Sequence, residues 1–186
     1  MFQVRIHGRG GQGVVTAAEM LSIAAFLEGK HAQAFPSFGS ERMGAPVVSY
    51  CRIDDREIRA REPILAPDAL IIQDPTLLQS VDVFQGLNPE GFILINSRRS
   101  FEDLGIAEFV SGFPAHHVCD VGATELAVKH VGRPVPNAAL LGGFAAISGQ
   151  IHMESVEKAI EQKFPGTIGA ANVAAAREAF ELAQAA

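Results

Sequence analysis

The chain has little cysteine, few aromatic side chains other than phenylalanine, and no excess of positive charge. Of its 186 residues two are cysteine, one is tyrosine and none is tryptophan. Cys51 and Cys119 lie far apart and form no C-x-x-C pair, which argues against a disulfide framework and against a zinc or iron–sulfur site in this chain. The formal net charge of −6 offers no cluster of Lys and Arg for nucleic acid. Partners are therefore expected to be proteins or small molecules.

Long apolar stretches are also missing. No segment approaches the ~18 consecutive apolar residues of a membrane-spanning helix, and the N-terminus lacks the pattern of a signal peptide. We therefore expect a cytoplasmic chain without a membrane span. The hydrophobic content of 48% is nevertheless high, so either the core is large or apolar surface is reserved for partner subunits. The length is typical of one domain, residues 1–186, and no repeat or linker divides it.

Apolar runs alternate with helical patterns along the chain. Strands are expected at 2–6, 31–35, 47–53, 69–73, 92–95 and 117–121, and helices at 14–28, 124–131, 138–147, 154–163 and from 173 to the C-terminus. The strand at 47–53 turns at Asp54-Asp55 and returns through 57–59, as in a hairpin. The later strands are unbroken apolar runs, typical of central strands. The pattern predicts an α/β fold, a single three-layer domain with a mostly parallel sheet, a hairpin insertion and a helical C-terminal third.

A glycine cluster separates the first strand from the first helix. Its glycines are Gly8, Gly10, Gly11 and Gly13. Glycines let the backbone approach a ligand closely, and the N–H groups that open a helix favour a phosphate. The turn is therefore predicted to face an anion, although a tight turn without a ligand has the same sequence.

The glycine spacing also matches the dinucleotide fingerprint G-x-G-x-x-G. That motif requires an acidic residue at the end of the second strand. The segment 31–35 runs into Pro36 without one, and Glu28 lies before it. A stand-alone NAD(P)-binding protein of Rossmann-like fold is therefore kept only as an alternative.

A long apolar loop between Phe35 and Val47 is the second informative segment. It contains two prolines, two glycines, two phenylalanines and the pair Glu41-Arg42. A loop of this length and composition is usually functional and would face a ligand or another subunit. In the alternative, Phe35 and Phe38 cap the core while Glu41 and Arg42 form a solvated pair.

Together these motifs resemble the gamma subunit of pyruvate:ferredoxin oxidoreductase, a module found across the 2-oxoacid:acceptor oxidoreductases. The resemblance covers the domain, and its specific motifs are His7 to Gly13 with Thr16 to Glu19, Gln33 to Pro36, Phe38-Gly39, Glu41-Arg42, Gly44 to Val47 and Arg52 to Asp55. The loop favours the pyruvate type, while branched-chain, indolepyruvate, aryl-glyoxylate and 2-oxoglutarate types stay open.

The resemblance implies a division of labour among subunits. In this family the alpha and beta subunits hold thiamine diphosphate, iron–sulfur clusters carry electrons to ferredoxin or another acceptor, and coenzyme A takes the acyl group. The gamma module is associated with coenzyme A binding. We therefore expect a non-redox subunit, inactive alone, that assembles with alpha, beta and a ferredoxin-like delta subunit. A scaffold subunit without a ligand is the second alternative.

Coenzyme A carries a pyrophosphate and a 3′-phosphate, which call for backbone N–H donors and a cation. The predicted coenzyme A-binding residues are Gly8, Arg9, Gly10, Gly11, Gln12, Gly13, Thr16 and Arg42, and no catalytic or metal-binding residue is predicted. Arg9 is the first choice for a phosphate, although it suits equally an acidic residue of a neighbouring subunit. Fused family members carry Thr, Asn and Lys where this chain has Val14, Ala18 and Glu19. The prediction therefore rests on the backbone from Gly10 to Gly13.

Three further polar positions have ordinary structural explanations. Asp74-Pro75 follows a strand and is expected to form a turn. His116-His117 and Cys119 are read as part of a strand rather than as metal ligands, because neighbours along a strand face opposite sides. Asn137 is expected to cap an apolar helix of small residues, and the resemblance implies that this helix lies near the subunit junction.

Overall fold

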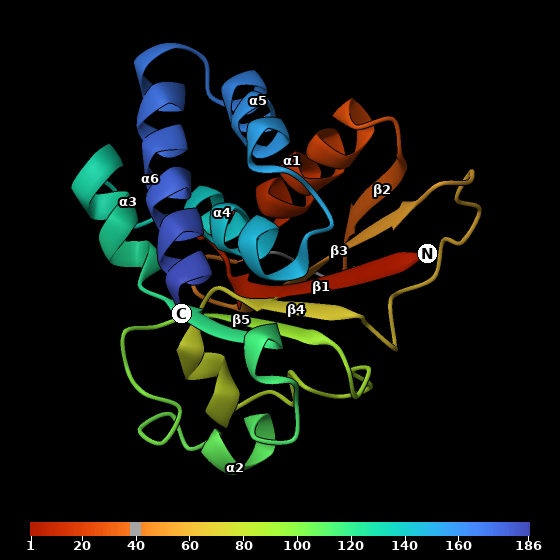
Figure 1. The fold of residues 1–186 in the computed structure, drawn as a ribbon, viewed down its shortest axis with the longest axis vertical. Coiled ribbons are helices and arrows are strands. Elements are labelled where there is room, and N and C mark those ends of the chain that lie inside the picture. Colours follow the sequence, from red (N-terminus) through yellow and green to blue (C-terminus); the bar gives the residue numbers. More distant parts are fainter. Residues whose placement is uncertain (38–41) are drawn as a thin grey trace.

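The computed structural model describes residues 1–37 and 42–186 (Figure 1). The strands are β1 (Phe2–Arg9), β2 (His31–Pro36), β3 (Pro46–Asp54), β4 (Ala69–Ile72), β5 (Phe92–Asn96) and β6 (Val118–Val121). The helices are α1 (Val14–Leu27), α2 (Ala107–Val110), α3 (Ala123–Val131), α4 (Asn137–Ser148), α5 (Met153–Lys163) and α6 (Gly166–Ala185), with short 3₁₀ turns η1 (Pro75–Gln79) and η2 (Ala115–His117). Within the described ranges no helix is long and apolar enough to span a membrane.

The strands form one sheet in the order β2-β3-β1-β4-β5-β6. Strands β1, β4, β5 and β6 run parallel, whereas β3 runs antiparallel to both of its neighbours, β1 and β2. Helices α1 and α3 to α6 cover one face, and α2 with the irregular segments around it lies against the other (Figure 1). A separate apolar cluster fills each side of the sheet. The predicted α/β class, with helices on both faces of a mostly parallel sheet, is confirmed.

The predicted hairpin has a different second strand from the one expected. Strand β3 pairs with β2, from His31 opposite Asp54 to Pro36 opposite Ser49, and 57–59 form no strand. The physical reason is that β1 and β2 already occupy both edges of β3. The chain after β3 therefore has no strand partner and crosses the sheet as an irregular segment.

Buried side-chain donors hold that irregular segment in place. Arg52, only 2% exposed, donates to the carbonyl of Glu62 at 2.6 Å. Gln33 donates to Ala60 at 2.7 Å, and Arg5 donates to Ile64 at 3.3 Å. Backbone carbonyls that a strand partner would otherwise bind are satisfied by side chains of the sheet instead.

The last helix begins earlier than predicted, at Gly166 rather than at Val173. The predicted helices at 154–163 and from 173 onward leave Pro165-Gly166-Thr167 in a loop between them. Pro165 instead occupies the N-cap position of α6. Proline is tolerated there because it has no N–H that needs an intrahelical partner.

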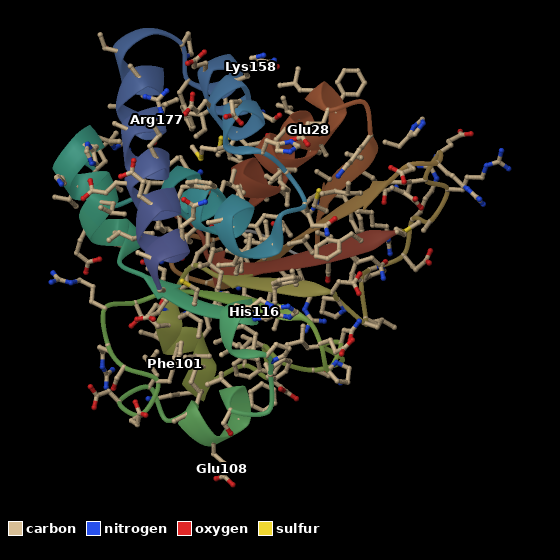
Figure 2. All side chains as sticks on the ribbon, in the orientation of Figure 1. Glu28, Phe101, Glu108, His116, Lys158 and Arg177 are labelled. Atoms are coloured by element: carbon tan, nitrogen blue, oxygen red, sulfur yellow. The ribbon has the colours of Figure 1, made fainter. Side chains whose placement is uncertain are left out.

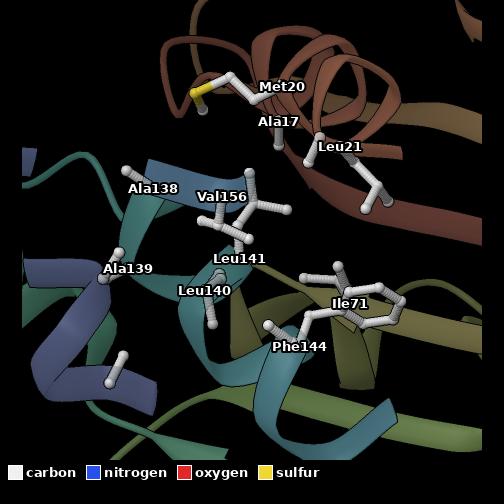
Figure 3. Packing of buried hydrophobic residues seen from close by; sticks show 14 of the residues in the cluster. Ala17, Met20, Leu21, Ile71, Ala138, Ala139, Leu140, Leu141, Phe144 and Val156 are labelled. Atoms are coloured by element: carbon white, nitrogen blue, oxygen red, sulfur yellow. The ribbon is translucent and has the colours of Figure 1, made fainter. Parts of the chain in front are cut away.

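Helix α4 lies in the centre of the molecule, between the sheet and the other helices (Figure 3). Its residues from Asn137 to Ala145 are all buried within the chain, and its expected proximity to a subunit junction stays a prediction. Gly142 explains the small residues: a Cβ placed on it would lie 1.9 Å from the carbonyl oxygen of Ala176 on α6. The close approach of two helix backbones compensates for the poor helix propensity of glycine.

We expect Gly142→Ala to destabilise the fold by about 2–3 kcal/mol, because the added methyl group must push α6 away from α4. Gly143→Ala is the matched control, since its Cβ would meet only side-chain atoms at ordinary contact distances, those of Leu94 at 3.4 Å and of Val121 at 3.6 Å. That control should be neutral or stabilising by up to ~1 kcal/mol. Urea unfolding of both variants measures the difference, and equal free energies of unfolding would contradict the packing described.

A buried histidine makes the fold sensitive to acid. His7, which is 5% exposed, accepts a hydrogen bond from Nε of Arg5 at 3.0 Å on its Nε2 atom. Burial and then the positive charge of Arg5 lower the pKa of His7 to about 4. The ring therefore stays neutral in the folded chain at pH values where an unfolded histidine takes up a proton.

Stability should fall as pH drops from about 6.5 toward 4, because in that window the unfolded chain binds a proton at His7 that the folded chain does not. Between pH 7 and pH 4.5 this amounts to about 2–3 kcal/mol. His7→Gln keeps an acceptor for Arg5 and should remove that loss, whereas His31→Gln, at an exposed position of β2, should not. Urea unfolding at both pH values tests this, and identical pH dependence in the two variants would refute it.

Candidate functional site

The glycine turn lies where β1 ends and α1 begins, and its backbone conformations require glycine. Gly11 has φ +94° and Gly13 has φ +71°. A Cβ on Gly10 would lie 2.1 Å from the carbonyl oxygen of Arg42, and one on Gly13 would lie 2.3 Å from Nδ2 of Asn137. The turn therefore fits closely between the 42–45 segment and the start of α4.

The carbonyl oxygens of the turn are held inside the protein. Gln73 donates from Nε2 to the carbonyl of Gln12 at 2.8 Å, and Asn137 donates from Nδ2 to that of Gly13 at 3.2 Å. The carbonyl of Gly10 accepts from the N–H of Gly44 at 3.0 Å.

The N–H groups of the same backbone have no acceptor within residues 1–37 and 42–186; they are those of Gly11, Gly13, Val14, Val15 and Thr16. These donors stand at the positive end of the α1 dipole. The arrangement is suited to an anion, and anion binding at the turn stays a prediction.

A cluster of four side chains, which we call the Asp74 latch, ties the turn to the end of β4. It consists of Arg9, Gln12, Asp74 and Thr76. Gln12 accepts the N–H of Arg9 at 2.8 Å through Oε1 and donates to Asp74 at 2.8 Å through Nε2. The Arg9 guanidinium lies 3.3 Å from the Asp74 carboxylate and donates to Thr76 at 3.0 Å. Both predicted side chains, Arg9 and Gln12, therefore bind within the chain.

Asp74 stays ionised at neutral pH. Burial alone would raise its pKa, but hydrogen bonds from Thr76 and Gln12 and the charge of Arg9 lower the pKa below its ordinary value overall. The same carboxylate caps η1, accepting from the N–H of Thr76 at 3.0 Å. The predicted turn at Asp74-Pro75 is thus confirmed, and it has the additional role of fixing the glycine turn.

A cleft of about 380 Å³ opens beside the turn. Its walls are the turn with the start of α1, the loop between α3 and α4, and the start of α6, through Gly11, Gly13, Thr16, Val131, Arg133, Val135, Asn137, Phe164, Ile168 and Asn172. Four of these side chains are apolar, and among residues 1–37 and 42–186 the lining contains one cation and no acidic residue. In a chain of net charge −6, a cleft with this lining is electrostatically suited to an anion that carries an apolar group.

Arg42, the second predicted cation, is exposed and starts the segment that returns to β3. Its carbonyl accepts the N–H of Ala45 at 3.0 Å, and the N–H of Gly10 donates to Ala45 at 2.9 Å. Met43 lies over Gly11 and is 86% exposed. Phe38 and Glu41 lie outside the described residues, so both interpretations of this loop stay predictions.

The other candidate residues lie away from the turn. His117 stacks on Phe92 with ring centroids 4.1 Å apart, and β6 starts only after it, at Val118. Both cysteines are buried, and burial raises the pKa of Cys51 to about 12 and, together with the charge of Asp120, that of Cys119 to about 11. Where the chain is described, no three His, Cys, Asp or Glu side chains gather to hold a metal ion.

Charged side chains elsewhere bridge helices at the surface, among them Arg177 and Glu28 (Figure 2). A larger cavity, about 640 Å³, lies there between α4, α5 and α6. Its charged lining includes Glu154, Glu157 and Glu181, which disfavours an anionic ligand. The cleft at the glycine turn is therefore the better candidate site.

Sequence reasoning missed Gln73 and Arg133. Gln73 carries a signal, because ligand-site residues in α/β sheets follow the carboxyl ends of strands where the chain switches faces. Here β1 leads to α1 on one face and β4 leads to η1 on the other, so Gln73 stands at that point. No sequence pattern singles out Arg133, which reaches the cleft from a loop more than a hundred residues after the turn.

We expect Asp74→Ala to loosen the glycine turn, because Arg9 and Gln12 lose their shared acceptor. The free energy of unfolding should fall by about 1–3 kcal/mol, and hydrogen exchange should accelerate at the amides of Gly10 and Gln12, which donate to Ala45 and Arg9. Asp103→Ala, which removes an exposed carboxylate, is the control and should change neither measurement. Unaltered exchange in Asp74→Ala would show that the latch does not hold the turn.

Comparisons with known proteins agree with one another. The family model described as pyruvate ferredoxin/flavodoxin oxidoreductase matches residues 3–182. A relative from Pyrococcus abyssi, the common gamma subunit of pyruvate/ketoisovalerate oxidoreductases, is 46% identical over 184 residues, which cover 99% of this chain and 98% of the relative. The crystal structure of a pyruvate oxidoreductase subunit from Thermotoga maritima has a TM-score of 0.80 at 35% identity and covers 97% of this chain and 95% of that one.

The same fold recurs inside a longer protein. A 2-oxoglutarate:ferredoxin oxidoreductase from Magnetococcus marinus, solved with coenzyme A bound, has a TM-score of 0.70 at 18% identity. The match covers 99% of this chain and 30% of that one. At this identity the likeness concerns the fold alone.

Proposed function

This chain belongs to the pyruvate ferredoxin/flavodoxin oxidoreductase family, and we propose on that basis that it is the gamma subunit of a coenzyme A-acylating 2-oxoacid oxidoreductase. The complex would convert a 2-oxoacid, coenzyme A and an oxidised acceptor into an acyl-coenzyme A, carbon dioxide and the reduced acceptor. The names of the Pyrococcus and Thermotoga relatives favour pyruvate as the substrate. The family predicted from the motifs is thereby confirmed.

The chain's own role in the proposed complex is to bind coenzyme A and to assemble with other subunits. Thiamine diphosphate, which supplies the decarboxylation chemistry, and the iron–sulfur clusters belong to the alpha, beta and delta subunits in this proposal. Clusters are held by sets of cysteine thiolates, whereas this chain has two buried cysteines whose raised pKa values keep them protonated. Two protonated thiols do not provide the ligands of an iron–sulfur cluster, which supports a non-redox subunit that is inactive alone.

The observation that carries the proposal is the set of N–H groups of Gly11 and of Gly13 to Thr16 at the start of α1, beside a cleft whose lining, in the described part of the chain, contains no acidic residue. Backbone donors at a helix N-terminus bind phosphate groups. The pyrophosphate of coenzyme A would occupy this position, and the apolar side chains of Val135 and Ile168 would cover the adjoining part of the molecule. Thr16 lines the same cleft and can add a hydroxyl.

The sheet topology supports coenzyme A over a dinucleotide. A dinucleotide fold places a second parallel strand next to the first, and that strand supplies the acidic residue for the ribose. Here the neighbour of β1 on that side is β3, which runs antiparallel, and β2 lies beyond it. Strand β2 ends at Phe35-Pro36 without a carboxylate.

We expect Gly11→Ala to weaken coenzyme A binding in the assembled complex, with an increase of about tenfold or more in KM. Alanine adopts a backbone φ of +94° only under strain, so relaxation of that strain should move the N–H groups of the turn, and the added Cβ would also displace the exposed Met43 side chain, whose Sδ lies 2.3 Å away. Gly29→Ala is the matched control, because its φ is +82° but nothing lies within 4 Å of its Cβ. Carbon dioxide release without coenzyme A should be normal in both variants.

Two results would contradict the proposal. If KM for coenzyme A is unchanged in Gly11→Ala while the complex stays intact, the glycine turn is structural only. If the chain purified from its natural host elutes as a monomer without thiamine diphosphate or iron–sulfur partners, the assignment as a gamma subunit is wrong. Saturable NADH fluorescence with such a monomer would support the dinucleotide alternative instead.

A further inference from the structure

Coenzyme A presents two separate negatively charged groups to its binding site. The pyrophosphate and the 3′-phosphate are attached to the same ribose, so one short cleft can hold both. Backbone N–H groups at the start of α1 are suited to one of them. A second phosphate at the far side of the ribose requires a further donor, preferably a cation.

Arg9 is poorly placed to be that cation. Its guanidinium already lies 3.3 Å from Asp74 and donates to the Gly44 carbonyl at 3.1 Å and to Thr76 at 3.0 Å. A phosphate would have to compete with an ionised carboxylate for the same donors, so Arg9 contributes more to holding the turn than to binding a second anion.

Arg133 has the opposite properties. It is the single cationic side chain in the cleft lining, it is exposed, and no carboxylate lies within ion-pair distance of it in the described ranges, 1–37 and 42–186. Arg133 and Gly13 line the same cleft. A phosphorylated ligand anchored at the turn therefore meets one uncommitted guanidinium.

The backbone that carries Arg133 is well defined. Gly132, with φ +83°, ends α3 and donates to the carbonyls of Ala127 and Val128 at 3.1 Å. Pro134 and Pro136 restrict the following residues, and Asn137 then binds the glycine turn itself at 3.2 Å. The loop is thus fixed at both ends relative to the turn, as a binding residue requires.

We propose that Arg133 binds the 3′-phosphate of coenzyme A and makes the cleft prefer coenzyme A over dephospho-coenzyme A. This inference rests on the proposed function, since it concerns the same cleft. Arg133 is thereby a specificity-determining residue, whereas the glycine turn binds the pyrophosphate that both molecules share.

The test combines the removal of one side chain, that of Arg133, with the removal of one ligand group, the 3′-phosphate of coenzyme A. Equilibrium binding of coenzyme A and of dephospho-coenzyme A is measured by calorimetry on the assembled complex, with the 2-oxoacid left out. The wild-type complex should bind coenzyme A about tenfold more tightly, the size expected for a partly exposed charge-assisted contact. Arg133→Ala should remove that preference and leave the affinity for dephospho-coenzyme A unchanged.

Three variants complete the test. Arg133→Lys keeps the positive charge and should retain part of the preference, because a guanidinium binds a phosphate with two donors and an ammonium as a point charge. Arg56→Ala removes an exposed arginine outside the cleft lining and should leave both affinities as in wild type. Gly11→Ala should weaken both ligands by the same factor.

The outcomes separate the two proposals. If Gly11→Ala weakens both ligands but Arg133→Ala keeps the wild-type preference, or weakens both ligands equally, the assignment of Arg133 is overturned and coenzyme A binding at the turn stands. If the wild-type complex shows no preference, the assignment is likewise overturned. If Gly11→Ala changes neither affinity, the proposed function of the turn itself fails.

Discussion

One carboxylate holds together two strand ends that are far apart in the sequence. Asp74 follows β4, and through Arg9 and Gln12 it fixes the backbone that leaves β1. Because Gln12 is bound at both ends of its amide, the carbonyl groups of the turn point inward and its N–H groups point out. The helix dipole, the cleft and the glycines would all be present without this contact, but they would not be aligned. A hydrogen bond to a charged group is strong enough to maintain such an arrangement.

The elements that depend on local sequence were predictable. The strands of the sheet were predicted to within a few residues from apolar runs bounded by glycine and proline. The glycine turn was correctly predicted to precede a helix. The predicted hairpin was wrong because β1 and β2 pair with both edges of β3, which leaves no edge for residues 57–59. The predicted start of α6 was wrong because a proline is equally compatible with a loop between two helices and with the N-cap position of a helix.

The candidate site shows the same difference between features set by the local sequence and features set by long-range contacts. Residues 8–13 form a continuous segment and were predicted as a unit, whereas their partners Gln73, Asp74 and Asn137 come from two other parts of the chain. Arg133 has no local signature at all and is brought to the turn only by the packing of α3 and α4 over the sheet. Long-range contacts of this kind depend on how all the strands and helices pack together. Neither the composition nor the spacing of residues specifies that packing.

The three walls of the cleft are also separated in time when the protein is made. Residues 11–16 leave the ribosome early, residues 131–137 follow much later, and the wall that includes Asn172 is among the last segments to appear. A nascent chain therefore carries the glycine turn long before it has a cleft. Because synthesis runs from the N-terminus, any truncated product that stops before α6 lacks one wall of the cleft. The cleft can therefore form only after the start of α6 has been synthesised.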